Sequence, residues 1–204
     1  DMEMYDQATD THAEVRTSTL SSQLGEVSYI MADKTGTLTR NLMLFKNCSV
    51  GGVKYGSKHR QQFNPKIILS DLKTNQRDNV EELAHFLTAC SVCHTVVPEK
   101  TTEDVVYHAS SPDEHALVTF ARNAGFIFHS RTPDLVQVTE KMSDSTVERV
   151  YTLLYVIEFD SIRKMMGVVV RSERGLIRLY VKGAVSLYLS LFLSLSVSLS
   201  LSPT

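Results

Sequence analysis

A short apolar run that ends at an aspartate constrains the fold of this chain more than any other stretch. Residues 27–32 (VSYIMA) have the β-branched and aromatic composition of a buried parallel strand, and Asp33 follows them directly. An aspartate just past such a strand lies at the carboxyl edge of an open sheet, which is where such sheets bind ligands. We therefore expect residues 27–32 to be one strand of a parallel α/β sheet and Asp33 to be a site residue at its carboxyl end.

The residues that follow this strand (DKTGTLT, 33–39) fit a phosphoryl-acceptor loop. The carboxylate of Asp33 is a nucleophile of the kind that forms aspartyl-phosphates. Lys34 offsets anionic charge, and Gly36 lets the backbone approach phosphate oxygens. Thr35 and Thr37 supply hydroxyl donors. An ordinary acidic turn is the alternative and would be favoured for a lone Asp-Lys pair, but the full run favours the acceptor.

Helical spacing and capping patterns predict helices near residues 16–23, 80–95 and 111–124. Asn79 with Glu82, and Ser111 with Glu114, have the spacing of capping boxes. Gly125 is expected to end the last of these helices.

Three strand-like runs follow, at residues 150–159, 164–171 and 176–181. The segment 172–175 (SERG) between the last two is typical of a hairpin turn. Strands in sequence after two helices predict an antiparallel sheet covered on one side, which is an α+β arrangement.

Cys90, Cys93 and His94 form a C-x-x-C-H pattern, which is found at sites of covalent haem attachment. The two cysteines also lie at helical spacing with Leu83 and Leu87, and buried cysteines are common in protein cores. The core interpretation is favoured. An odd total of 3 cysteines does not indicate a disulfide framework.

Residues 158–164 (EFDSIRK) place an aromatic side chain at a strand end beside a basic turn. Phe159 there could stack on a purine, and Arg163 and Lys164 could meet phosphates. Taken alone, a phenylalanine that ends a strand is more often part of the core.

In four segments the sequence resembles the phospholipid-flipping (type IV) P-type ATPases. The run 33–39 matches the phosphorylation signature of P-type ATPases. Residues 111–118 (SPDEHALV), 158–164 (EFDSIRK) and 182–184 (KGA) resemble elements of the nucleotide-binding domain of the flippase branch. The resemblance covers residues 1–184.

For the phosphoryl acceptor, the resemblance implies that ATP delivers its γ-phosphoryl group to Asp33, with Lys34 and Thr37 beside it. It also implies a Mg²⁺ ion held by Asp33 and by the backbone carbonyl of Thr35.

For the nucleotide, the resemblance implies that Phe159 lies on the adenine ring and that Glu114 lies near it. Lys182 would reach the same pocket, and Gly183 would permit close backbone approach. Arg163 is a further candidate for nucleotide contact.

The implied fold is mixed α/β and α+β. Residues 1–45 would be the N-terminal part of a haloacid-dehalogenase-like phosphorylation domain with a parallel sheet. Residues 46–185 would be an incomplete α+β nucleotide-binding domain with an antiparallel sheet. Residues 186–204 form a Ser/Leu low-complexity tail that we interpret as foreign to the domain, for example as read-through beyond an exon boundary.

The implied function is ATP-driven phospholipid translocation by a multi-pass membrane protein, of which this chain is a truncated portion on the cytosolic side. An accessory subunit is a further possible partner. One alternative is a non-catalytic ATP-binding fragment. Another is a soluble haloacid-dehalogenase-like phosphatase, which usually carries a second aspartate where this chain has Thr35. The net charge of -2 gives no electrostatic footprint for nucleic acid.

Overall fold

The computed structural model describes residues 5–7, 9–12, 14, 17, 19–34, 36–40, 42–56, 63–74, 78–101, 105–142 and 145–184. Contacts divide the chain into two compact units, with the boundary between Asn41 and Leu42. Thr35 and the Ser/Leu segment predicted at 186–204 lie outside the described residues.

The first unit contains little regular structure. Strands β1 (Tyr5–Asp6) and β2 (Thr11–His12) pair antiparallel, and helix α1 spans Leu20–Gly25, close to the helix expected at 16–23.

The predicted parallel strand at residues 27–32 is wrong for this structure. The segment is not a strand, and its apolar side chains are open to solvent, with Tyr29 and Ile30 each 87% exposed. A parallel strand is stable only between hydrogen-bonded neighbours, and the part of the chain that the structure describes contains no parallel pair.

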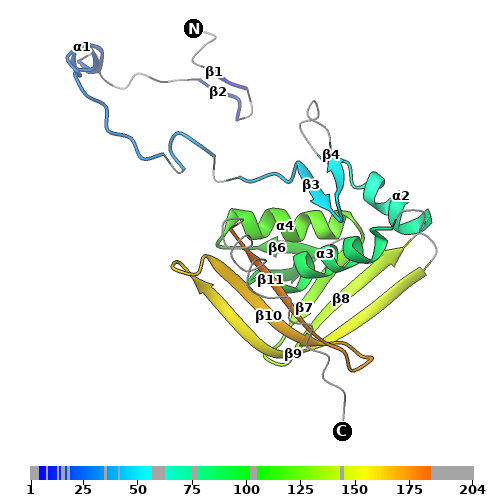
Figure 1. The fold of residues 1–204 in the computed structure, drawn as a ribbon. Coiled ribbons are helices and arrows are strands. Elements are labelled where there is room, and N and C mark those ends of the chain that lie inside the picture. Colours follow the sequence, from blue (N-terminus) through cyan, green and yellow to red (C-terminus); the bar gives the residue numbers. More distant parts are fainter. Residues whose placement is uncertain are drawn as a thin grey trace. The chain divides into compact units, whose positions relative to one another are not determined.

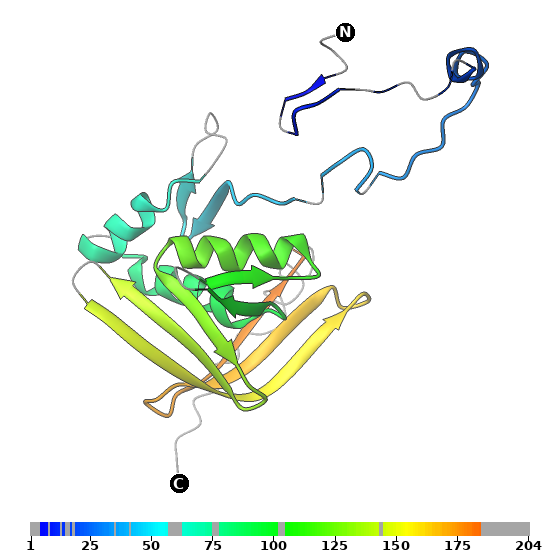
Figure 2. The same ribbon diagram turned by 180° about the vertical axis from the view of Figure 1, so that it is seen from behind.

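A five-stranded antiparallel sheet forms the base of the second unit (Figures 1 and 2). Its order is β11-β10-β9-β8-β7, so each strand pairs with its neighbour in sequence. The strands are β7 (Phe126–Arg131), β8 (Leu135–Met142), β9 (Ser145–Asp160), β10 (Met165–Arg171) and β11 (Ile177–Gly183). The three predicted strands and the hairpin turn at 172–175 are confirmed, whereas β7 and β8 were not predicted.

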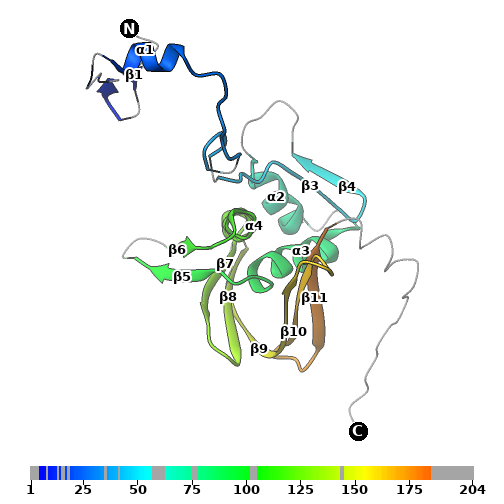
Figure 3. The ribbon, with the colours of Figure 1, turned by 90° about the vertical axis from the view of Figure 1, so that its left-hand side faces the viewer.

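Helices cover one face of this sheet (Figure 3). They are α2 (Lys66–Thr74), α3 (Val80–Val92) and α4 (Pro112–Asn123). Two hairpins flank them, β3 (Asn47–Val50) with β4 (Val53–Gly56) and β5 (Val97–Lys100) with β6 (Val105–His108). The predicted α+β arrangement, with an antiparallel sheet covered on one side, is confirmed for this unit.

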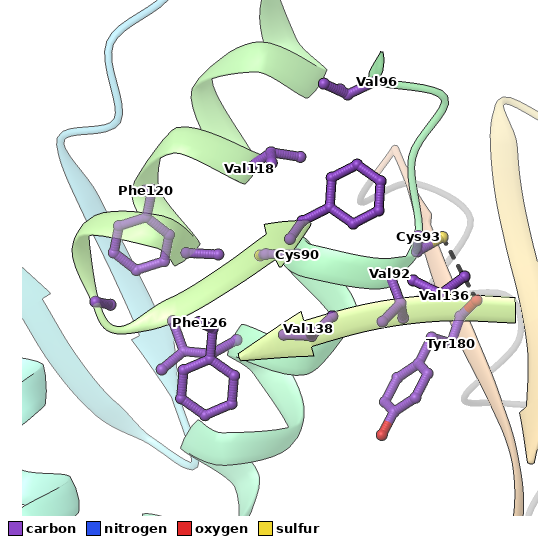
Figure 4. Packing of buried hydrophobic residues seen from close by; sticks show 14 of the residues in the cluster. Cys90, Val92, Cys93, Val96, Val118, Phe120, Phe126, Val136, Val138 and Tyr180 are labelled. Atoms are coloured by element: carbon purple, nitrogen blue, oxygen red, sulfur yellow. Dashed lines mark hydrogen bonds between the residues drawn. The ribbon is translucent and has the colours of Figure 1, made fainter. Parts of the chain in front are cut away.

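The core lies between the helices and the inner face of the sheet (Figure 4). Cys90 and Cys93 are both buried in it, and the thiol of Cys93 contacts the carbonyl oxygen of Tyr180 at 3.6 Å. Burial raises the pKa of Cys90 to about 12 and that of Cys93 to about 11. These surroundings are those of core residues, as the sequence favoured.

Both predicted capping boxes are wrong. Asn79 and Ser111 precede α3 and α4, but neither side chain caps its helix. The side-chain amide of Asn79 instead donates to the carbonyl of Val50 and to the hydroxyl of Tyr55, at 2.9 and 3.0 Å. The carboxylate of Glu114 likewise bonds to Thr95 and Lys182, and not to a backbone N–H at the start of its helix. Gly125, at φ +88°, follows the end of α4 as expected.

Candidate functional site

A cavity of about 1270 Å³ opens where the start of α4, the turn after α3, the β9–β10 turn and the end of β11 meet. Four of the five predicted nucleotide residues line it. Its lining residues are Thr95, Ser111, Asp113, Glu114, Leu117, Arg131, Val156, Glu158, Phe159, Ser161, Lys164, Met166, Lys182, Gly183 and Ala184.

Glu114 is the most constrained polar side chain of this cavity. It lies in the first turn of α4, and Lys182 at the end of β11 places its Nζ atom 2.5 Å from Oε1. Thr95 donates twice to Oε2, from its backbone N–H at 3.0 Å and from its hydroxyl at 2.7 Å. Burial alone would raise the pKa of Glu114, but the hydrogen bonds from Lys182 and Thr95 outweigh burial and lower the pKa. The carboxylate is therefore ionised near neutral pH.

Phe159 presents an apolar face at the rim of the cavity. It lies one residue before the end of β9 and is 65% exposed. The core reading of this side chain is therefore wrong. An aromatic ring in that position can stack on a planar base.

The turn after Phe159 is held by Asp160. Its carboxylate accepts hydrogen bonds from the N–H groups of Ile162 and Arg163, at 2.7 and 3.3 Å, and the Arg163 Nε lies 3.4 Å from Oδ2. Arg163 is thus turned to Asp160 and is not among the cavity-lining residues. Lys164, at φ +50°, lines the cavity in its place.

Gly183 is required by strand packing. It pairs with Met165 of β10, and a Cβ atom at this position would lie 2.7 Å from the carbonyl oxygen of Lys164. The close approach that the structure shows here is therefore between two strands of the protein itself.

Thr95 and Arg131 line the cavity but were not predicted as site residues from the sequence. Thr95 follows the C-x-x-C-H pattern directly, and Arg131 is the last residue of β7. Both act on backbone or buried groups, so no local pattern marks them. Neither residue belongs to a sequence motif of the kind that marks a binding site.

Asp33 lies in the first unit, in a surface turn. The N–H group of Lys34 donates to its Oδ1 at 2.7 Å. The carbonyl of Lys34 in turn accepts from the N–H groups of Leu38 and Thr39, both at 3.1 Å, which closes the loop. Gly36 has φ +81°, a conformation that favours glycine, and Thr37 is exposed.

The donors for a Mg²⁺ ion are few in this loop. Among the described residues, no group of three or more His, Cys, Asp or Glu side chains could hold a metal. One exposed carboxylate, that of Asp33, still fits the usual chemistry of this ion. Mg²⁺ is commonly bound by one or two carboxylates together with phosphate oxygens and water.

Comparison with known proteins identifies the family. A family model described as P-type ATPase, cytoplasmic domain N matches residues 82–192, which is more than half of the chain and includes all the residues that line the cavity. This chain belongs to the P-type ATPases.

Several curated relatives of this P-type ATPase chain are phospholipid-transporting ATPases. It is 41% identical to phospholipid-transporting ATPase IC of Xenopus tropicalis over 90% of this chain and 16% of the relative. It is 44% identical to a phospholipid-transporting ATPase of Schizosaccharomyces pombe over 90% of this chain and 15% of the relative. For human phospholipid-transporting ATPase ID the identity is 41%, over 93% of this chain and 17% of the relative.

This chain therefore spans about a sixth of the length of these relatives. None of the helices in the described segments is both long enough and apolar enough to cross a membrane.

Proposed function

We propose that this chain is the part of a phospholipid-transporting P-type ATPase that binds ATP and carries the phosphoryl-acceptor aspartate. The observation that carries the proposal is the convergence of Glu114, Phe159 and Lys182 on one cavity, from three segments far apart in the sequence. A volume of about 1270 Å³ is ample for a nucleotide. The family match and the phospholipid-transporting relatives support the same conclusion.

In this proposal the adenine ring of ATP stacks on the exposed face of Phe159. The Glu114 carboxylate, held by Thr95, would accept a hydrogen bond from the amino group of the base. Lys182, paired with Glu114, would lie with it at the adenine end, and Lys164 would give the cavity wall positive charge toward the phosphates. Gly183 keeps β10 and β11 together beneath them, and Arg163 is a contact only if it leaves Asp160.

At Asp33, a carboxylate oxygen attacks the γ-phosphorus of ATP, the bond to the bridging oxygen breaks, and ADP leaves. Lys34 offsets negative charge as the phosphate approaches, and the Thr37 hydroxyl is a donor to its oxygens. Asp33 and the backbone carbonyl of Thr35 would hold Mg²⁺, which when bound neutralises phosphate charge. The absence of a carboxylate at position 35 favours a persistent phosphoenzyme over rapid hydrolysis.

In the whole protein, we propose that this phosphorylation drives phospholipid translocation, with the present portion on the cytosolic side of the membrane. Residues 1–45 would belong to a haloacid-dehalogenase-like phosphorylation domain and residues 46–185 to the nucleotide-binding domain. The lipid, and any accessory subunit, would be bound by parts of the pump outside this chain. The share of the relatives that this chain covers, about a sixth, supports its being a portion of a longer pump.

A non-catalytic ATP-binding role is favoured for the chain by itself. The segment before Asp33, residues 27–32, is not a strand and lies open to solvent, so the sheet edge that should position the acceptor is not formed in the described residues. We therefore expect ATP binding to be weak, with a dissociation constant on the order of 1 mM or higher. We also expect the chain alone to form no acid-stable, hydroxylamine-sensitive phosphoenzyme.

Two measurements test these statements. Titration of the 204-residue chain with ATP, followed by NMR, should shift the signals of Phe159 and Lys182; unchanged signals at saturating ATP would overturn the proposed site. Incubation with γ-labelled ATP and Mg²⁺ should leave the chain unlabelled. Robust labelling that Asp33→Asn abolishes would instead show that the chain is a competent acceptor.

A further inference from the structure

We propose that Arg131 is a positioning residue of the nucleotide cavity, which holds the main chain at His94 and Thr95 and thereby orients the carboxylate of Glu114. This inference rests on the proposed function, since it concerns the same cavity. It assigns a role to a residue that no motif marks.

Arg131 ends strand β7, and its side chain lines the cavity. Its Nη1 atom donates a hydrogen bond to the carbonyl oxygen of His94. Among the described residues this arginine forms no salt bridge with a carboxylate. The half-buried guanidinium of Arg131 thus forms a charge-assisted hydrogen bond with a backbone carbonyl of the turn that follows α3. This contact restricts the position of the turn.

The His94 ring also restricts the same turn, through hydrogen bonds to its backbone. Nε2 donates to the carbonyl of Ser91 at 2.9 Å, and Nδ1 accepts from the N–H of Val96 at 3.1 Å. The ring also packs edge-on against Phe128, with 4.5 Å between centroids. His94 is buried, and the contacts of its carbonyl and of its ring together hold the turn in place.

Thr95 lies between His94, whose carbonyl accepts from Arg131, and Val96, whose N–H donates to the His94 ring, and Thr95 lines the cavity. Both of its donors meet Oε2 of Glu114, and the other carboxylate oxygen meets Lys182. A turn that shifts by a few tenths of an ångström would lengthen two hydrogen bonds at once. Arg131 therefore controls the orientation of Glu114, and of Lys182 beyond it, through the position of Thr95.

Two variants separate positioning from charge. Arg131→Lys keeps the positive charge but loses the planar fork, and Arg131→Met loses both. Arg122→Met is the matched control, because the Arg122 guanidinium also donates to a backbone carbonyl, that of Val105 at 2.7 Å, but outside the cavity. Circular dichroism and urea denaturation would establish that each variant of the 204-residue chain is folded.

The first readout needs no nucleotide. Hydrogen exchange of the Thr95 amide should become about tenfold faster in both Arg131 variants, because its bond to Glu114 is loosened, and should stay unchanged in Arg122→Met. A Thr95 amide that exchanges at the wild-type rate in Arg131→Met would overturn the proposal. So would a normal rate in Arg131→Lys alone, since charge by itself would then be sufficient.

The second readout is binding of adenosine, AMP and ATP, followed by NMR titration. A positioning role predicts the same loss for all three ligands, about tenfold. A loss that appears only when phosphates are present would show direct phosphate contact by Arg131 and would overturn the proposal. If the wild-type chain binds none of the three, the proposed function fails, while the amide exchange of Thr95 still decides the role of Arg131.

A double-variant cycle supplies a third check, which remains valid if the Arg131 variants lose some stability. Thr95→Val removes the hydroxyl that Arg131 is proposed to position. Losses in adenosine affinity from Thr95→Val and Arg131→Lys should combine to much less than their product. Fully multiplicative losses would show that the two residues act independently, against the proposal.

Discussion

The Nζ atom of Lys182 lies 2.5 Å from Oε1 of Glu114, so the two charged side chains that meet across the cavity wall neutralise each other. The pair joins the edge of the sheet at β11 to the first turn of α4. It therefore ties together two of the elements that line the cavity.

Replacement of Glu114 by glutamine should destabilise the chain by about 1 kcal/mol at pH 7, because Lys182 loses its counter-charge. The effect is modest because Lys182 is partly exposed to solvent. The pKa of Glu114 is lowered in the folded state, so its contribution is complete above the ordinary value of 4.5 and is lost as pH falls through the folded value. Urea denaturation of both proteins should thus differ at pH 7 and converge in acid. Glu82→Gln, at an exposed helix position, is the control and should match the wild type throughout.

Removal of the Phe159 ring should weaken ATP binding and leave folding intact. Base stacking on an aromatic ring contributes about 1–3 kcal/mol, so Phe159→Ala should lower ATP affinity about tenfold. The ring is 65% exposed, so the free energy of unfolding should change by less than about 0.5 kcal/mol. Tyr155→Ala removes an equally exposed ring, 66%, from the same strand but outside the cavity. Equal losses of affinity in the two variants would contradict a stacking role for Phe159.

A methyl group at position 183 should separate the two strands that frame the cavity. The added Cβ of Gly183→Ala would lie 2.7 Å from the Lys164 carbonyl oxygen and 2.9 Å from the Met165 Cβ atom. Such overpacking costs about 1–3 kcal/mol, measurable as a lower urea midpoint. Gly167→Ala is the comparison, since its Cβ would meet other atoms only at 3.4 Å or more. A Gly183→Ala protein as stable as the wild type would show that β10 and β11 can part without cost.

Protonation of His94 should make the chain acid-sensitive. Burial lowers the pKa of this ring to about 4, against 6.5 when it is free, so the folded state holds it neutral. The unfolded chain binds the proton first, and stability is therefore full above pH 6.5 and falls between pH 6.5 and 4, by on the order of 3 kcal/mol.

The His94 contribution is isolated by comparing slopes of unfolding free energy against pH. His94→Gln should lack this component of the slope over that range, whatever its stability at pH 7. His108→Gln, which alters an exposed ring, should keep it. A His94→Gln slope identical to that of the wild type would mean that the ring takes up its proton without unfolding.

The three thiols should resist alkylation in the folded chain. Burial raises the pKa of Cys48 and Cys93 to about 11 and that of Cys90 to about 12, so few thiolates are present at pH 7. Cys48, which is only half-buried, should react first, and all should react in denaturant. Mass spectrometry after a timed pulse of iodoacetamide gives the order; rapid native labelling of Cys90 would contradict the packed core.

Much of the fold followed from local pattern. Helices α3 and α4 and strands β9 to β11 were predicted because their apolar periods are long and their turns contain strong signals. Strands β7 and β8 were missed although buried Phe126 and Phe128, and Val136 and Val138, alternate along them. The strand predicted at 27–32 was wrong for a different reason. Its composition suits a strand, but a parallel strand needs neighbouring strands from distant parts of a sequence.

The candidate site followed the same division. Glu114, Phe159 and Lys182 were expected together, and the fold brings them to one cavity, although their roles there still rest on proposal. Glu114 itself shows why capping patterns mislead, because a cation and two donors outcompete a helix-end amide for a carboxylate. Thr95 and Arg131 were not expected, since their importance depends on where one backbone carbonyl lies after folding.

The sheet order also decides how firmly each wall of the cavity is anchored. Phe159 belongs to the part of β9 beyond Thr152, which pairs only with β10, and Lys182 belongs to β11, which also pairs only with β10 among the described strands. Edge strands fray more readily than interior ones. Both Phe159 and Lys182 thus lie on edge strands, so a ligand bound between them would register as quieter motion of β11 and of the end of β9.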